Sequence, residues 1–388
     1  MSPRPNIIFI VADDLGFADL GCYGGRDATF GPVSPVLDGL AAKGLRFPQG
    51  YSNSPVCSPT RFALMTARYQ YRLRGAAEEP INSRSRGSTT LGLPPDIPTL
   101  PSLLRAEGYR TALVGKWHLG FPPAFGPTRS GYEEFFGPMS GGVDYFTHCS
   151  SNGQHDLWQG EQERHEEGYL TDLISQRAAD YVQRMAAGAK AGTPFFLSLH
   201  YTAPHWPWET RDDAALAEEV RSNIFHLHGG NIHTYRRMIH HMDEGIGRLM
   251  AALRAQGLER DTLVVFTSDN GGTQQSSQEP LRGNKGGYYE GGIREPFIVR
   301  WESMNNLAVC QITANRKKGT DYAQRHPDHR SRSVGDFGRT FLGERESQLF
   351  RAAPDDADVM PINCLYCVTR FVCNGGRENP TAPSPIGS

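Results

Sequence analysis

Short apolar runs that end in polar residues restrict the possible folds of this chain more than any other feature. The run from Ile7 to Val11 is continuous, rich in β-branched residues and followed at once by Asp13-Asp14. A continuous apolar run is typical of a parallel strand that helices cover on both faces. Similar runs occur at Tyr109 to Val114, Phe195 to His200 and Leu263 to Phe266. The sequence therefore predicts several buried strands, each followed by polar side chains.

Helical patterns alternate with these runs. Thr99 to Glu107 predicts a short helix with a threonine cap, and Gly108 ends it. Apolar residues recur at helical spacing from Tyr235 to Leu253, and Gly257 ends that pattern. This alternation predicts an α/β fold with a doubly wound, mostly parallel sheet flanked by helices. Ligands of such sheets bind outside the carboxyl ends of the strands, where the polar residues fall.

Length, charge and cysteine content exclude several classes of protein. The 388 residues fit one large α/β domain with a smaller appendage, or two equal domains. The net charge of −2 argues against a nucleic-acid partner. The longest early apolar run is too short for an export signal or a membrane span, so we expect a cytoplasmic protein with no membrane partner. Seven cysteines, an odd number, argue against a disulfide framework.

The pattern changes after Trp301. No comparable apolar run follows, and 316–351 has almost no apolar periodicity. We therefore predict a catalytic domain at 1–301 and an atypical tail at 302–388, either disordered or the product of a frameshifted reading frame. Four cysteines could bind zinc in this tail, but their spacing fits no common module and coincidence is the better interpretation: Cys310, Cys364, Cys367 and Cys373.

Oxygen ligands follow two of the predicted strands. Asp13, Asp14, Asp269 and Asn270 offer carboxylate and amide oxygens, which Ca²⁺ or Mg²⁺ prefers over the nitrogen and sulfur ligands of zinc. The alternative is that acidic residues at strand ends only cap the following helices. For Asp13-Asp14 taken alone, the two interpretations are about evenly matched.

A cysteine stands at the start of a predicted helix. In Cys57-Ser58-Pro59-Thr60-Arg61, serine at the cap and proline at the first helical position predict a helix over Pro59 to Arg68. The positive end of that helix favours an anion near Cys57, and Arg61 adds a charged donor. An isolated cysteine is more often a small buried hydrophobic residue, but this context favours a functional one.

Further cations and proton carriers lie past the strand ends. Lys116, His118, His205 and Lys285 are candidates, although each taken singly could be a surface charge or a satisfied polar group. Three carboxylates around a divalent ion would leave a net negative charge that repels an anionic ester. Lys116, Lys285 and Arg61 would reverse that sign.

Taken together, these segments give the chain a family resemblance. From Pro5 to about Trp301 it resembles a formylglycine-dependent, arylsulfatase-like sulfatase of the alkaline phosphatase superfamily. The matching pieces are, in order, Pro5-Asn6-Ile7 through Asp13-Asp14-Leu15-Gly16, Cys57-Ser58-Pro59-Thr60-Arg61 with Leu64 to Arg68, Gly108-Tyr109 through Gly115-Lys116-Trp117-His118-Leu119-Gly120, Ala203-Pro204-His205, Ser268-Asp269-Asn270-Gly271-Gly272, and Arg282-Gly283 through Lys285 to Pro296.

The resemblance implies a cofactor and a partner enzyme. In the family, the cysteine that matches Cys57 is oxidised before folding to formylglycine by a dedicated modifying enzyme, and its hydrate is the nucleophile. The expected cation is Ca²⁺, with Mg²⁺ the alternative. Its ligands would be Asp13, Asp14, Asp269, Asn270 and the modified Cys57.

The resemblance also assigns roles in the hydrolysis of a small-molecule sulfate ester. Lys285 and His205 would stabilise the ester and help the alcohol leave, while Arg61 and Lys116 would orient the hydrate. His118 would then take a proton from the second hydroxyl, which releases sulfate. A serine in place of the hydrate has no second hydroxyl, so release would stall.

The chain departs from the family pattern in three places. Ala67 stands where the family usually has glycine, within the signature read by the modifying enzyme. Val36 replaces a usual asparagine, with no consequence that the sequence reveals. The tail after Trp301 replaces the usual small C-terminal domain with its antiparallel sheet.

Several alternatives stay open at this stage. A phosphodiesterase or phosphonate monoester hydrolase would use the same groups, and a chain with an altered reading frame would be inactive. Aryl or other small soluble sulfates are the expected substrates, and the oligomeric state is not predicted. We expect Gln154 to Trp158 at the substrate rim, and Ser140 either touches the sulfate or forms a turn.

Overall fold

A computed structural model describes residues 4–25, 32–72, 81–215, 217, 230–303 and 360–361. Its strands are β1 Asn6–Ala12, β2 Leu45–Tyr51, β3 Arg110–Gly115, β4 Glu134–Gly137, β5 Trp158–Gln159, β6 Gln162–Glu163, β7 Phe195–His200, β8 Thr262–Ser268, β9 Arg294–Arg300 and β10 Met360–Pro361. Its α-helices are α1 Pro35–Ala42, α2 Cys57–Thr66, α3 Leu100–Ala106, α4 Leu170–Lys190, α6 Ile232–Ala255 and α7 Glu290–Ile293.

One sheet organises the described part of the chain. Its strand order is β10-β2-β9-β8-β1-β7-β3-β4-β5-β6, and the five central strands from β8 to β4 are all parallel. Strand β9 runs antiparallel to both β8 and β2, and β5 and β6 add an antiparallel ribbon at the other margin. The predicted doubly wound, mostly parallel sheet is confirmed, and the antiparallel margins are an addition to it.

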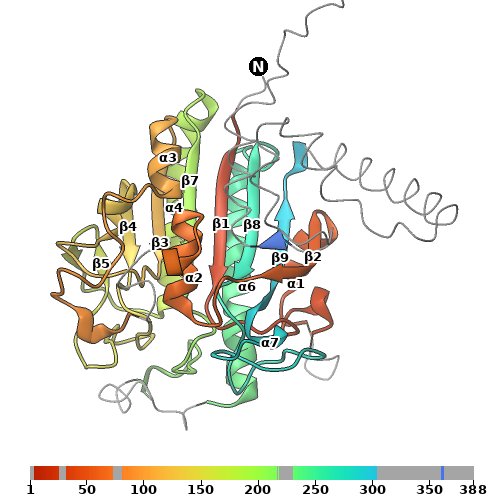
Figure 1. Ribbon diagram of the computed structural model, residues 1–388. Coiled ribbons are helices and arrows are strands. Elements are labelled where there is room, and N and C mark those ends of the chain that lie inside the picture. The colour runs from red at the N-terminus through yellow and green to blue at the C-terminus, as the bar shows by residue number, and fades with distance from the viewer. Residues whose placement is uncertain are drawn as a thin grey trace, which may run out of the picture.

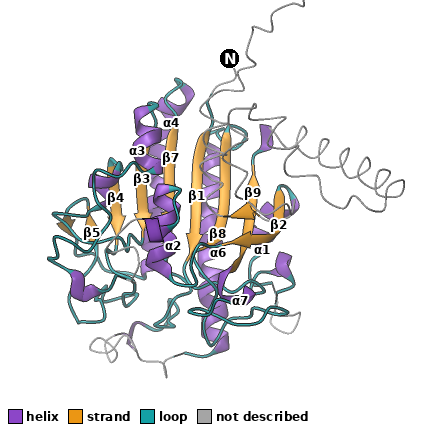
Figure 2. Ribbon diagram, in the orientation of Figure 1, coloured by secondary structure: helices purple, strands orange, loops and turns teal. Residues whose placement is uncertain are grey.

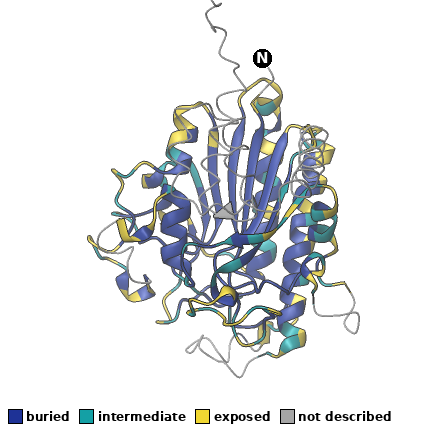
Figure 3. Ribbon diagram, turned by 45° about the vertical axis from the view of Figure 1, so that its right-hand side comes forward, coloured by how far each residue is buried: buried dark blue, intermediate teal, exposed yellow. Residues whose placement is uncertain are grey.

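Strand β1 contributes to a hydrophobic core on each face of the sheet. Ile8 and Ile10 belong to the core formed with α1, α4 and α6, whereas Ile7 and Phe9 belong to the core formed with α2 and α3. These helices are labelled in Figure 1. Successive side chains of a strand point to opposite faces, so an uninterrupted apolar run fills both layers. In Figure 3 the central strands are buried, and most exposed residues lie on helices and loops.

The predicted helix boundaries hold for α3 and α6. Thr99 caps α3, because its side chain accepts a hydrogen bond from Ser102 N at 3.2 Å while Ser102 Oγ accepts one from Thr99 N at 2.9 Å. Gly108 and Gly257 follow these helices with φ of 84° and 67°, the left-handed conformation that glycine adopts without strain. The 21-residue helix α4, which packs against α6, was not among the predicted elements.

Four neighbouring strands bring their carboxyl ends to one edge of the sheet. Strands β8, β1, β7 and β3 are adjacent and parallel, and they end at the lower edge in Figure 2. The segments that follow them therefore meet, as the strand-end rule predicts. No helix among the described residues is both long enough and apolar enough to cross a bilayer. Apart from 302–303 and 360–361, the predicted tail lies outside the described residues, as do its four cysteines.

Candidate active site

Asp13 and Asp14 lie directly past β1 and are buried. Asp14 has a φ of 61°, so the chain turns sharply as it leaves the strand. Both carboxylate oxygens of Asp14 have partners: Lys285 Nζ lies 2.7 Å from each, and Asn270 Nδ2 donates to Oδ1 at 2.7 Å. These bonds join the ends of β1 and β8 to the loop that carries Lys285.

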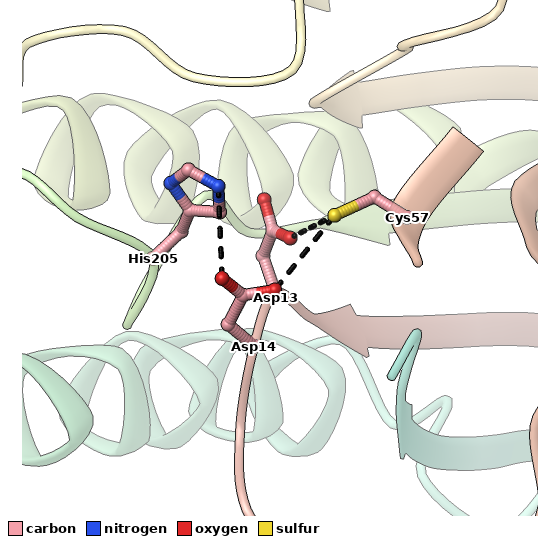
Figure 4. Close-up of side chains that lie close together, drawn as sticks. All are labelled: Asp13, Asp14, Cys57 and His205. Carbon is pink, nitrogen blue, oxygen red and sulfur yellow. Dashed lines mark hydrogen bonds and ion pairs between the residues drawn. The ribbon is translucent and has the colours of Figure 1, made fainter. Parts of the chain in front are cut away.

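Cys57 faces both carboxylates from α2. Its Sγ lies 3.4 Å from Asp13 Oδ1 and 3.7 Å from Asp14 Oδ1, and Figure 4 shows the three side chains converging with His205. Burial, followed by the charge of Asp269, raises the pKa of the thiol well above its usual value. An unmodified Cys57 is therefore a neutral thiol rather than a thiolate nucleophile.

The start of α2 differs from the prediction. The helix begins at Cys57, and the preceding Val56 is extended with no side-chain capping bond, so Ser58 is not the cap. Ser58 Oγ instead accepts a hydrogen bond from Ile81 N at 2.9 Å, and Pro59 is tolerated because the first-turn amides lack helical partners. Cys57 thus sits in the first turn, closer to the positive end of the helix than expected.

A buried arginine joins α2 to the end of β8. Arg61 donates to Asp269 Oδ2 from Nε at 2.9 Å, and its Nη2 lies 2.8 Å from the same oxygen. Its Nη1 donates to the carbonyl oxygen of Lys116 at 3.2 Å, while Lys116 Nζ contacts the Asp13 carboxylate. The cations predicted to reverse the charge of the site therefore pair with its carboxylates.

His118 and His205 lie against one glycine-rich loop. A Cβ atom added at Gly141 would lie 2.5 Å from His118 Cε1, and one added at Gly142 would lie 3.0 Å from His205 Cε1. Side chains at these two positions would collide with the imidazoles. The glycines therefore let the loop after Ser140 close over both histidines.

Burial keeps both histidines neutral near neutral pH. It lowers the pKa of His118 well below its usual value, and the nearby Lys116 adds to the shift. It lowers the pKa of His205 to about 3, where Lys285 also contributes and Asp14 opposes. Among the described residues, His118 Nδ1 is buried without a hydrogen-bond partner. A neutral imidazole nitrogen of this kind can accept a proton.

Ser140 and the predicted rim have local partners. Ser140 N donates to Asp156 Oδ2 at 2.8 Å and Ser140 Oγ donates to Gly142 O at 3.3 Å, which fits the turn interpretation. Within 154–158, the residues from Asp156 to Trp158 are buried. The contact of Ser140 with sulfate and the rim role of Gln154 to Trp158 stay predictions.

The donor atoms fit a hard divalent cation. Ligand atoms of Asp13, Asp14, Cys57 and His205 all lie within 4.8 Å of one another. Asn270 Oδ1 is buried and has no hydrogen-bond partner in the described part of the chain, although a buried amide oxygen is normally satisfied. Carboxylate and amide oxygens suit Ca²⁺ or Mg²⁺, so the residues present fit the ion expected from the sequence.

Sequence reasoning missed His200, the last residue of β7. Its Nδ1 lies 3.3 Å from Arg61 Nη1 and 3.3 Å from the carbonyl oxygen of Lys116. Leu199, just before it, belongs to the apolar run, so the sequence indicated His200 only as the last residue of a predicted strand. The only sign of its role in the sequence was a polar residue at the end of an otherwise apolar run.

Comparison with known proteins identifies the family. The model of the family described as Sulfatase matches residues 5–342. The chain belongs to the sulfatase family. The match extends past Trp301, where we expected the resemblance to end.

Individual sulfatases are similar over most of the described chain. Mouse arylsulfatase J is 37% identical over 321 residues, which cover 79% of this chain and 50% of that protein. Mouse N-acetylgalactosamine-6-sulfatase is 32% identical and covers 80% of this chain and 59% of its own length. The chain thus spans about half to three fifths of these curated relatives.

A solved structure agrees with the sulfatase fold. The crystal structure of Ps i-CgsB in complex with k-i-k-neocarrahexaose superimposes with a TM-score of 0.66 at 33% identity. The match covers 77% of this chain and 66% of that one. The α/β architecture therefore agrees with both the sequence relatives and this structure.

Proposed function

We propose that this sulfatase hydrolyses sulfate esters, using a nucleophile derived from Cys57 and a bound divalent cation. The observation that carries the proposal is the convergence of Cys57 on Asp13 and Asp14, with Cys57 Sγ 3.4 and 3.7 Å from their carboxylate oxygens. A buried thiol with a raised pKa is a poor nucleophile, which supports the conversion of Cys57 to formylglycine. A formylglycine-generating enzyme is then a required partner.

The proposed ion is Ca²⁺, with Mg²⁺ as the alternative. It would be held by Asp13, Asp14, Asp269, Asn270 and the modified side chain at 57. Bound there, the ion supplies positive charge that activates the nucleophile and stabilises developing negative charge. The unpartnered Asn270 Oδ1 is the atom of this set that most needs a ligand.

The charges of the site suit an anionic ester. Three carboxylates face three cations: Asp13, Asp14 and Asp269 against Arg61, Lys116 and Lys285. These charges balance, so a divalent ion leaves the site net positive and attractive to a sulfate ester. Paired cations also hold the carboxylates in place.

The remaining groups handle protons and the leaving alcohol. Lys285 and His205 contact Asp14 at 2.7 and 3.6 Å, and from there they would stabilise the ester and the departing oxygen. His118, with its unpartnered Nδ1, would accept the proton that accompanies sulfate release. Arg61 and Lys116 would orient the nucleophile.

Phosphorus esters are the alternative substrates. A phosphodiesterase or phosphonate monoester hydrolase would use the same charges, but the relatives reported above are named as sulfatases, which favours sulfate. Their names include an arylsulfatase and a sugar sulfatase, so they support the ester class and leave the alcohol open. The cytoplasmic location and the inactive altered-frame product both stay predictions.

A substrate comparison tests the proposal. The chain would be produced together with a formylglycine-generating enzyme, and the peptide containing residue 57 would be checked by mass spectrometry. Rates on 4-nitrophenyl sulfate and on an aryl phosphonate monoester would then be measured with Ca²⁺, with Cys57→Ala as the control. We expect faster turnover of the sulfate and none by the control. A large preference for the phosphonate, or no activity in fully converted protein, would reject the proposal.

A further inference from the structure

Two buried acidic side chains lie outside the candidate metal cluster. Asp144 and Glu209 have exposed fractions of 0% and 1%. Asp144 Oδ2 and Glu209 Oε1 are both buried without a hydrogen-bond partner, and neither carboxyl group pairs with a cation in the described part of the chain. Buried carboxylates are normally paired or hydrogen-bonded. These two therefore need another source of stabilisation.

A shared proton supplies that stabilisation. Burial and the nearby Asp144 raise the pKa of Glu209 to about 9, and the protonated Glu209 donates a hydrogen bond to Asp144. Two carboxyl groups in one buried site do not both ionise readily, so one of them keeps its proton. The single remaining charge lies on Asp144, whose Oδ1 accepts hydrogen bonds from Phe146 N at 3.0 Å and Thr147 N at 2.6 Å.

The acids and phenols around the pair favour the same protonation state. The charge of Asp213 adds to the rise in the pKa of Glu209. Tyr145 and Tyr169 are buried phenols whose pKa values burial raises, so both are neutral. These neighbours make a second negative charge on the pair harder to form.

The basic groups nearby do not neutralise the pair either. Burial lowers the pKa of His148, next to Asp144, to about 4. It also lowers the pKa of His241 on α6 to about 4, and that ring packs against Tyr169 rather than the pair. Arg211 is bound to Asp172 at 2.7 Å. The proton between the two carboxyl groups is therefore what holds them together.

Tyr145 links this pair to His205. Tyr145 N donates to Glu209 Oε2 at 3.2 Å, and Tyr145 OH donates to the carbonyl oxygen of His205 at 2.8 Å. Tyr145 directly follows Asp144 in the chain, so the shared proton is a third connection between 144–145 and 205–209. These three connections form a clamp on the segment that carries His205. In Figure 4 the imidazole of His205 is directed toward Asp14.

Resting on the proposed sulfate ester hydrolysis, we infer that Glu209 is a positioning residue for His205 and works only while it shares a proton with Asp144. Loss of the proton leaves two buried carboxylates facing each other with no cation between them, and such like charges repel strongly in a low dielectric. The two segments then separate, and Tyr145 no longer holds the His205 carbonyl. The imidazole is displaced from the departing oxygen, so activity falls as the pH rises through about 9.

A pH profile tests the role of the proton. Protein converted at residue 57 would be assayed with Ca²⁺ on 4-nitrophenyl sulfate from pH 7 to 10. At pH 9.5 we expect kcat/KM of the wild type to be roughly fourfold below its value near pH 7, as for one group with a pKa of about 9. Glu209→Gln should remove this decrease, because its amide donates to Asp144 and accepts from Tyr145 N without ionising. Exposed Glu167→Gln is the matched control and should follow the wild type.

A second substrate tests whether the clamp acts through His205. The poorer leaving group of phenyl sulfate depends more on help from His205 than 4-nitrophenolate does. Glu209→Ala and Tyr145→Phe should therefore lower kcat/KM for phenyl sulfate several-fold more than for 4-nitrophenyl sulfate. A purely structural role would lower both rates equally, by the folded fraction that urea unfolding reports. Equal losses on the two substrates, or the same pH profile in the wild type and Glu209→Gln, would overturn the inference.

Hydrogen exchange separates this inference from the proposed function, because it needs no turnover. At pH 9.5 the peptide that contains Tyr145 should exchange at least about threefold faster in the wild type than in Glu209→Gln, and at pH 7 the two should exchange alike. If this difference appears but no ester is hydrolysed, the clamp stands and the proposed function fails. If esters are hydrolysed but neither the exchange nor the pH profile differs, the clamp is wrong and the sulfatase proposal stands.

Discussion

Cys57 Sγ lies 3.4 Å from Asp13 Oδ1, although 44 positions separate the two residues in the chain. The contact exists because β1 ends where α2 begins its first turn, on one face of the sheet. A side chain at the positive end of a buried helix thus meets the carboxylates at a strand end.

Replacing Cys57 by serine should separate sulfate transfer from sulfate release. Serine supplies one hydroxyl and cannot regenerate an aldehyde, so we expect Cys57→Ser to give at most one turnover and to keep a covalent sulfate. Intact-protein mass spectrometry after incubation with substrate should show a gain of one SO₃ group. Continuous turnover by this variant would contradict the role given to residue 57.

Removing the cation should lower stability in a way that depends on Asp14. A ligand at one hundred times its Kd stabilises the folded state by about 2.7 kcal/mol. We therefore expect a chelator to lower the melting temperature of the wild type and Ca²⁺ to restore it. In Asp14→Asn, Ca²⁺ should raise the melting temperature much less. Exposed Asp96→Asn serves as the control. An increment that is equal in both variants would place the ion elsewhere.

Arg61 should matter for stability as well as for chemistry. Arg61→Met leaves Asp269 buried without its ion-pair partner, which costs about 3–5 kcal/mol in the free energy of unfolding. Arg61→Lys should cost less because a charge remains, although lysine cannot place two nitrogens on one oxygen. Adding Asp269→Asn to Arg61→Met should recover part of the loss. Urea unfolding would measure these free energies. A free energy of unfolding of Arg61→Met within ~0.5 kcal/mol of wild type, as for a typical surface substitution, would contradict this prediction.

Ala67 should be a site for stabilisation. It ends α2 with φ 53° and ψ 29°, a left-handed conformation that costs a residue with a Cβ atom about 1–2 kcal/mol. Ala67→Gly should raise the free energy of unfolding by about 0.5–1 kcal/mol after the greater flexibility of the unfolded chain is counted. The same change at Ala63, inside α2, should destabilise instead.

Glu209 should make stability fall as pH rises. Burial and the nearby Asp144 raise the pKa of Glu209 from 4.5 to about 9, so the folded state keeps a proton that the unfolded state releases. The free energy of unfolding should therefore decrease between about pH 4.5 and 9, by at most about 1.4 kcal/mol per pH unit. Glu209→Gln should flatten this dependence and exposed Glu167→Gln should not. Urea midpoints measured from pH 5 to 8 would test this. If the wild type and Glu209→Gln show the same dependence on pH, the raised pKa does not belong to Glu209.

The central part of the fold could be predicted from the sequence because β1, β7 and β8 are buried on both faces. Such strands appear in the sequence as unbroken apolar runs. Strand β2 was missed because its residues alternate between partly buried and exposed, and it contains Pro48. Strands β5 and β6 have two residues each, too short for any periodicity to appear.

The sequence predicted which residues belong to the site better than it predicted the contacts between them. Strand ends and motif residues pointed to Asp13, Asp269 and Lys116, and the structure brings all three together. Which cation pairs with which carboxylate depends on side-chain geometry that no spacing encodes. The backbone of Ala67 is a similar case, because the departure from glycine was visible while its left-handed φ was not.

The three buried carboxylates of the site are paired with three cations, so the protein itself neutralises their charge. If the proposed cation binds here, its loss would leave these charges paired, so we expect the protein to stay folded without it and to recover activity when the cation returns.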